Sequence, residues 1–152
     1  LVSHYSKFVP RLATLANPLY ALTRKEVPWK FGPLEKKAVE AIKVELLSDK
    51  ILIAYNDKLP LVLTTDASPV GISAVLAHKC AEGLRPVAYA SRTLTAAEKN
   101  YAQIDREALA VVFGVKYFHQ YLYGRKFTLR TDNRALTFIF KEDKPIPVMS
   151  AQ

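Results

Sequence analysis

Residues 60–66 read Pro-Leu-Val-Leu-Thr-Thr-Asp, a β-rich run that ends on an acidic side chain. Two more β-rich runs follow at residues 71–78 and 85–91, and the second of these is entered through Glu82-Gly83. Apolar and β-branched runs bounded by turn residues are typical of strands. Because the connections between the runs are short, we expect three successive antiparallel strands.

The chain after the third run has the pattern of a helix, a strand and a second helix. Thr95 and Glu98 have the spacing of a capping box, which predicts a helix start, and Gly124 is placed to end that helix. The apolar stripe between them advances in steps of three and four residues: Ile104, Ala108, Val111, Val115, Phe118 and Leu122. We expect a fourth strand over 126–131 and a short helix over 134–140. The order βββαβα predicts an α/β fold built on a mixed sheet.

The first fifty residues have a different character. They hold four prolines, and each proline marks a helix start or a break. Short helices are predicted over 13–22 and over 33–48, where Pro33 suits the first turn. We therefore expect a small helical unit at 1–50 and an α/β domain at 51–152.

Composition narrows the classes of function. The 152 residues include 22 Lys and Arg against 14 Asp and Glu, and the resulting charge of +8 favours a polyanionic partner such as nucleic acid. No apolar run reaches the ~18 residues of a membrane span, so no membrane partner is expected. The single cysteine, Cys80, excludes a disulfide framework and a cysteine-based zinc site.

Three carboxylates stand at positions that packing alone does not favour. Asp66 and Asp132 end predicted strands, and Glu107 lies about 60° from the centre of the apolar stripe of its helix. If the three converge, their repulsion calls for a cation, and hard oxygen ligands suit Mg²⁺ or Mn²⁺. Two such ions can hydrolyse a phosphodiester. The alternatives are purely structural roles, in which Asp132 caps the next helix and Glu107 pairs with Arg106 or a neighbouring lysine.

Taken together, several motifs give the chain a specific resemblance. Leu63-Thr-Thr-Asp66, Arg106-Glu107-Ala-Leu-Ala110 and Phe127-Thr-Leu-Arg-Thr-Asp132 resemble the ribonuclease H domain of Ty3/gypsy-type retrotransposon polyproteins. Upstream, Tyr5-Ser-Lys-Phe8-Val-Pro10 and Pro28-Trp29-Lys-Phe31 resemble the end of the reverse transcriptase, its thumb. The resemblance implies a ribonuclease H fold, which has a five-stranded mixed sheet. It also implies cleavage of the RNA strand of an RNA–DNA hybrid with two Mg²⁺ ions, which Mn²⁺ can replace.

The resemblance also implies roles for single residues. Asp66, Glu107 and Asp132 match three of the four metal-binding, catalytic carboxylates of the family. The fourth is expected beyond Gln152, together with the last strand and helix, so we expect residues 51–152 to be a C-terminally truncated domain. The alternative function is a catalytically incomplete fragment that binds nucleic acid or packs against the polymerase.

Further contacts to the hybrid are expected from six polar side chains: Ser68, Arg85, Arg92, Lys99, Asn133 and Arg134. Each has a structural alternative, because Ser68 suits a turn, Asn133 suits a helix cap and the basic residues suit a solvated surface. The expected partners are the RNA–DNA hybrid and the rest of the Pol polyprotein. The expected location is the cytoplasm, in a virus-like particle or replication complex, or the nucleus. The oligomeric state is not predicted.

Overall fold

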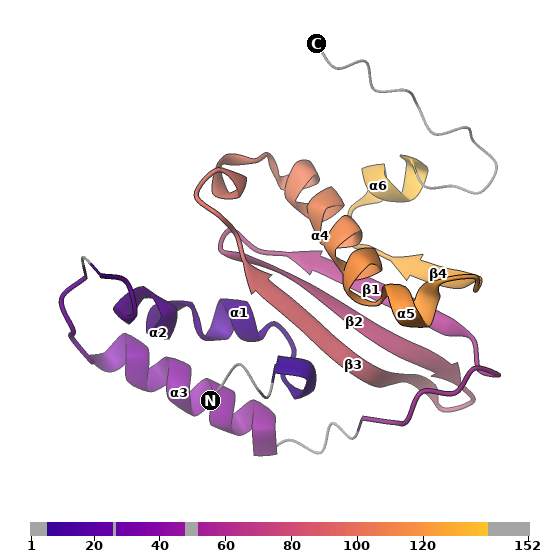
Figure 1. Cartoon of the computed structure of the whole chain (residues 1–152), viewed down its shortest axis with the longest axis horizontal. Helices are drawn as coiled ribbons and strands as arrows, with labels where there is room; N and C mark the ends of the chain where they lie inside the picture. Colours follow the sequence, from indigo (N-terminus) through magenta and orange to yellow (C-terminus); the bar gives the residue numbers. More distant parts are fainter. Residues whose placement is uncertain (1–5, 26, 48–51, 140–152) are drawn as a thin grey trace, which may run out of the picture.

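A mixed four-stranded sheet organises the protein. The computed structural model describes residues 6–25, 27–47 and 52–139. The strands are β1 (Leu61–Ala67), β2 (Gly71–Cys80), β3 (Gly83–Thr93) and β4 (Phe127–Arg130), and their spatial order is β3-β2-β1-β4 (Figure 1). β1 pairs antiparallel with β2, and β2 with β3, whereas β1 and β4 are parallel. The α/β fold with a mixed sheet, predicted from the sequence, is confirmed.

The prediction of one continuous helix from Thr95 to Gly124 is wrong. The capping box is present, because the Glu98 amide donates to Thr95 Oγ1 at 3.3 Å and the Thr95 amide donates to Glu98 Oε2 at 2.8 Å. It opens only a short 3₁₀ turn, η2 (Glu98–Asn100), after which Tyr101 is extended. The long helix α4 therefore begins at Gln103 and ends at Tyr117, and a short α5 (His119–Leu122) follows. Gly124 has φ 68°, so it ends the helical region as predicted.

The predicted apolar stripe is buried only in part. Val111, Phe118 and Leu122 of that stripe are buried, whereas Ile104 is 38% exposed, and α4 also buries Glu107, Ala110 and Gly114. Gly114 allows α4 to approach the sheet closely, since a Cβ there would lie 3.0 Å from the Cβ of Ala74. The helix lies closest to the sheet where its smallest residue faces it. Glu107 lies on the same face of α4 as Gly114, so this close approach also buries Glu107.

The helical unit upstream covers the other face of the sheet. It consists of α1 (Leu12–Leu15), α2 (Asn17–Leu22) and α3 (Pro33–Leu47), and it lies across the sheet from α4 (Figure 1). The Ala13 amide donates to Ser91 Oγ at 3.0 Å, and the hydroxyls of Thr14 and Ser68 lie 3.1 Å apart. A Cβ at Gly71 would lie 3.5 Å from that of Ala13. The unit is thus fixed against β2 and β3.

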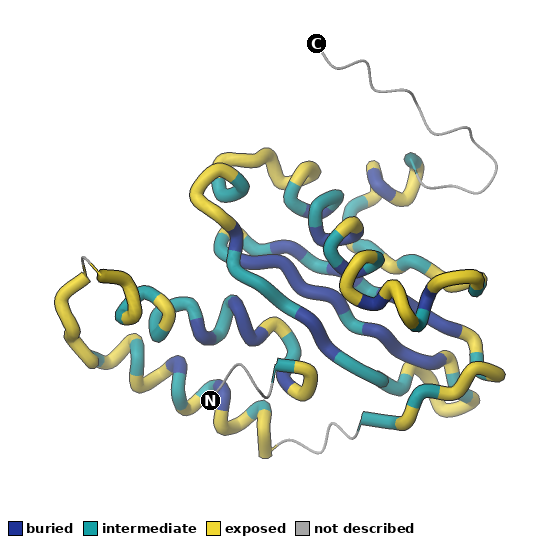
Figure 2. The backbone as a smooth tube through the Cα atoms, in the orientation of Figure 1, coloured by how far each residue is buried: buried dark blue, intermediate teal, exposed yellow. Residues whose placement is uncertain are grey.

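Burial is concentrated in the sheet and on the helical surfaces that face it. Figure 2 shows β1 and β2 as mostly buried, with exposed positions gathered at turns and on outer helix surfaces. A second apolar cluster joins Val9, Leu12 and Ala16 to Ile42 of α3. The short helix α6 (Arg134–Ile139) begins where predicted, and residue 140 lies outside the described residues. Among the described residues, no helix has the length and apolar character that crossing a bilayer requires.

Candidate metal centre

The site lies where two parallel strands part. β4 ends at Arg130, which pairs with Thr64, whereas β1 continues to Ala67. The last part of β1 therefore has no β4 residue beside it. The chain leaves β4 through Asp132 and enters α6. Parallel strands bring their carboxyl ends to one edge of a sheet, which is where such folds place ligands.

Carboxylates from both faces of the sheet meet in this opening. Asp66 pairs with Ser73 of β2, so its side chain is on the same face of the sheet as Ser73 and Gly71. This is the face that packs against α1, because a Cβ at Gly71 would lie 3.5 Å from that of Ala13. Glu107 arrives from α4, on the other side. One carboxylate oxygen from each of Asp66, Glu107 and Asp132 lies within 4.8 Å of the other two. The three side chains converge, as their positions in the sequence predict.

Glu107 is the buried member of this trio, with 2% of its surface exposed. Desolvation raises the pKa of its carboxyl, and the negative charges of Asp132 and Asp66 raise it further. Hydrogen bonds from Gln103 and from the Ala67 backbone act in the opposite direction. Gln103 Nε2 donates to Oε1 at 2.8 Å, while Oε2 is buried without a hydrogen-bond partner.

These properties fit a hard divalent cation. A buried carboxylate oxygen with no donor is costly, and so is the approach of three like charges. A cation among them would remove both costs. The donor set is carboxylate oxygen alone, which suits Mg²⁺ or Mn²⁺ rather than a softer metal.

The structure contradicts two structural alternatives, namely that Asp132 caps α6 and that Glu107 pairs with Arg106. Asn133, rather than Asp132, caps α6, because its Oδ1 accepts from the amides of Ala135 at 2.9 Å and Leu136 at 3.4 Å. Arg106 donates to Gln103 Oε1 at 2.8 Å, and Glu107 accepts from Gln103 instead of from this arginine. Asp132 and Glu107 are thus available to a ligand.

Sequence reasoning passed over two residues beside the trio. Gln103 precedes Glu107 by one helical turn, so its spacing could have revealed it. Arg11 lies far away in the chain, and no local pattern marks it. Its guanidinium is 3.8 Å from Asp66 Oδ2, and its backbone is left-handed with φ 49°. That conformation costs about 1–2 kcal/mol. The exposed ion pair offsets at most about 1 kcal/mol of this cost.

The side chains predicted to contact nucleic acid fall into two groups. Asn133 and Arg134 follow Asp132 directly, and Ser68 follows Asp66 by two residues. Ser68 also has a structural role, because its hydroxyl donates to the Gly71 carbonyl and accepts from the Gly71 amide, both at 3.0 Å. These three residues lie on segments that adjoin the trio.

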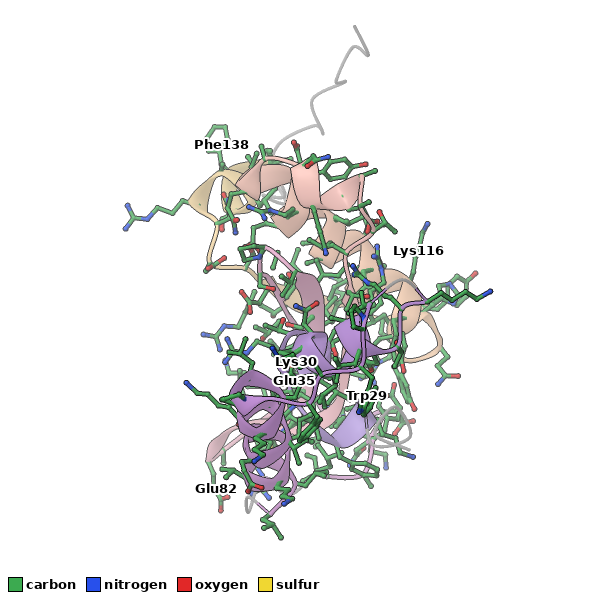
Figure 3. The ribbon with its side chains drawn as sticks, turned by 90° about the vertical axis from the view of Figure 1, so that its left-hand side faces the viewer. Trp29, Lys30, Glu35, Glu82, Lys116 and Phe138 are labelled. Atoms are coloured by element: carbon green, nitrogen blue, oxygen red, sulfur yellow. The ribbon has the colours of Figure 1, made fainter. Side chains whose placement is uncertain are left out.

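The remaining three lie elsewhere or have other partners. Arg85 pairs across the sheet with His78, at the end of β1 opposite to Asp66, and its ion-pair partner is Glu82. Figure 3 shows Glu82 and α6 at opposite ends of the molecule. Arg92 donates two hydrogen bonds to Glu98, at 2.7 and 2.8 Å. Lys99 is half-buried on η2.

The geometry and the comparisons with known proteins agree on the class of protein. Residues 31–129 match the model of the RNase H-like domain found in reverse transcriptase. The chain belongs to this family.

Individual relatives place it further. It is 36% identical over 138 residues to the Transposon Tf2-3 and Tf2-4 polyproteins of Schizosaccharomyces pombe. The match covers 89% of this chain but only 10% of each polyprotein, so the chain spans about a tenth of the length of these relatives. The resemblance to Ty3/gypsy-type polyproteins is confirmed.

Solved structures show the same fold. A foamy viral protease-reverse transcriptase (dRH) in complex with double-stranded DNA superposes with a TM-score of 0.69 at 20% identity, over 99% of this chain and 26% of that chain. A foamy viral protease-reverse transcriptase in complex with an RNA/DNA hybrid gives 0.68 at 20% identity, over 84% of this chain and 18% of that chain.

Proposed function

We propose that this chain is the ribonuclease H part of a retrotransposon reverse transcriptase, and that it hydrolyses the RNA strand of RNA–DNA hybrids. The observation that carries the proposal is the trio of Asp66, Glu107 and Asp132 around a buried, unpartnered carboxylate oxygen. These three residues are the proposed catalytic and metal-binding residues. Membership of the RNase H-like family supports this assignment.

Each ligand has a distinct part in the proposed mechanism. Two divalent ions, when bound, supply an activated water and a Lewis acid for the 3′ oxygen that leaves. Glu107 contributes Oε2 from a dry position, where charge interactions are strong. Asp66 and Asp132 are partly solvated, so their oxygens line the side from which a nucleic acid strand can approach.

The proposed substrate and partners follow from charge and from relatives. A net charge of +8 favours a duplex polyanion, and phosphate contacts alone suffice for binding that is independent of sequence. Selectivity for RNA requires contacts to the 2′-OH. Because the relatives are much longer polyproteins, we propose that the chain works as part of one, with residues 1–50 as the end of the polymerase and 51–152 as the nuclease domain.

The test is cleavage of an end-labelled RNA–DNA hybrid in Mg²⁺ and in Mn²⁺. We expect the RNA strand to be cut, the DNA strand to stay intact, and Asp66→Asn to abolish cutting. Asp105→Asn is the matched control, because Asp105 is an exposed acid on the same helix as Glu107 but outside the trio. If the folded chain binds the hybrid without cutting it, the proposal fails, and a binding or polymerase-packing module describes this chain better.

A further inference from the structure

We infer that Arg11 binds a phosphate of the nucleic acid strand held at the carboxylate trio. This inference rests on the proposed function and adds a residue from the helical unit to the nuclease site. Arg11 precedes β1 by about fifty residues in the sequence. Its side chain nevertheless lies at Asp66, with the guanidinium Nη1 3.8 Å from Oδ2.

The backbone holds Arg11 at this place. Val9 before it and Leu12 after it are buried, at 1% and 2% exposure, so the turn between them is tied to the core. The Arg11 carbonyl accepts from the amides of Thr14 at 3.0 Å and Leu15 at 3.2 Å, which opens α1. α1 is itself bonded to β3, because the Ala13 amide donates to Ser91 Oγ.

Stability does not account for an arginine at this position. Arg11 is the only non-glycine residue with positive φ among residues 6–25, 27–47 and 52–139, and glycine or asparagine would adopt this conformation with less strain. The ion pair with Asp66 is too exposed to offset that strain, with 67% and 43% of the two side chains accessible. Strain of this kind is typical of functional positions.

The charge of the site explains what Arg11 can do there. A divalent cation that takes up the charge of Asp66 would release the guanidinium from its carboxylate partner. Because the side chain is largely exposed, it can turn toward the solvent side of the trio. A phosphodiester brought to the metal centre places anionic oxygens on that side. The planar fork of a guanidinium matches two such oxygens better than an ammonium does.

The experiment measures hybrid binding and stability on the same variants of the full chain. Binding is followed by fluorescence anisotropy with a labelled RNA–DNA hybrid in Ca²⁺, over a range of salt concentrations. Arg11→Gln removes the charge, Arg11→Lys keeps it, and Arg11→Gly removes both the charge and the strain. Lys43→Gln is the matched control, because Lys43 is an exposed lysine on α3 that pairs with Glu40.

We expect Arg11→Gln to weaken hybrid binding about tenfold, the effect of losing one charge-assisted hydrogen bond. The slope of log K against log salt should fall by about 0.9, as for one lost phosphate contact. Arg11→Lys should recover part of the affinity, and Lys43→Gln should leave it nearly unchanged. Arg11→Gly should bind the hybrid as weakly as Arg11→Gln does, and yet it should unfold at a higher urea concentration than Arg11→Gln because it also removes the backbone strain. A merely structural arginine would lower affinity and stability together.

Two results would overturn the inference while the proposed function stands. In the first, Arg11→Gln binds the hybrid as the wild type does, and Asp66→Asn alone is inactive. In the second, Arg11→Gln binds Mn²⁺ more tightly than the wild type does, but its affinity for the hybrid is unchanged. Arg11 would then be only a counter-ion of Asp66. If the wild-type chain neither binds nor cuts the hybrid, the proposed function and the inference fall together.

Discussion

The carboxylate of Glu107 should destabilise the metal-free protein, and Glu107→Gln should therefore stabilise it. The nearest oxygens of the trio lie within 4.8 Å of each other. Two like charges at that distance repel by about 0.9 kcal/mol in water and by about 3.5 kcal/mol at an effective dielectric constant of 20. Because Asp66 and Asp132 are partly solvated, we expect the variant to gain about 2 kcal/mol in the free energy of unfolding at pH 7. Glutamine has the same shape and can still accept the bond from Gln103.

The pH dependence of this effect has a definite sign. The folded-state pKa of Glu107 is raised, so the folded protein holds its proton at a pH where the unfolded chain has lost it. The penalty is absent below the unfolded value near 4.5 and grows as pH rises through the raised folded pKa. Glu107→Gln removes this contribution, so the stabilities of wild type and variant should approach each other at low pH.

Urea unfolding in EDTA, followed by circular dichroism, measures the difference. Repeating it with 10 mM Mg²⁺ supplies the control, because metal binding stabilises only the protein that binds it. For a Kd near 1 mM the wild type would gain about 1.4 kcal/mol, and the variant much less. A variant that is less stable than wild type in EDTA would refute the reasoning, since Glu107 would then be a structural partner rather than a strained ligand.

Three further changes test other parts of the structure. Gln103→Met keeps the length of the side chain but cannot donate to the buried carboxylate of Glu107, so Mn²⁺ titration should show weaker metal binding, and urea unfolding in EDTA should show a loss of about 1–3 kcal/mol because the buried oxygen loses its donor. Glu98→Gln should cost about 1 kcal/mol at pH 7, because the bonds from Arg92 lower the pKa of Glu98 to about 2 and solvent screens the pair. That difference should shrink as pH falls from 4.5 toward 2, and a constant difference in urea unfolding would contradict it. Gly114→Ala should lower the thermal midpoint despite the better helix propensity of alanine, since the new Cβ would lie 3.0 Å from that of Ala74, and an unchanged or higher midpoint would show that the helix can shift.

Local patterns predict the sheet well, because they carry their own turn signals. Gly83 has φ 118°, as the β2–β3 turn requires, and Gly124 ends the helical region with φ 68°. The ends of α4 are set by tertiary contacts instead. Thr95 and Glu98 form the predicted capping box, but Glu98 also binds Arg92, which ties η2 to β3. The helix then has to restart at Gln103, and no local signal announces that break.

The residues of the candidate site also differ in how far the sequence predicts them. Asp66 and Asp132 follow from their places at the ends of strands, which a linear pattern can show. The burial of Glu107 follows from the close approach at Gly114, which only the packed structure shows. Arg11 could not be found from the sequence, because its relation to Asp66 depends on how the helical unit lies on the sheet.

The parallel pairing of β1 and β4 has a consequence for the order in which a nascent chain acquires its parts. β1, β2 and β3 are joined by tight turns and can pair as soon as they leave the ribosome. Leu61 of β1, however, pairs with Phe127 of β4, so the fourth strand can add to the sheet only after Phe127 has been synthesised. The loop to be closed includes all of α4, and long loops close late. The candidate metal centre is therefore among the last features to form, so an unfinished chain can pair β1, β2 and β3 well before the proposed nuclease site is assembled.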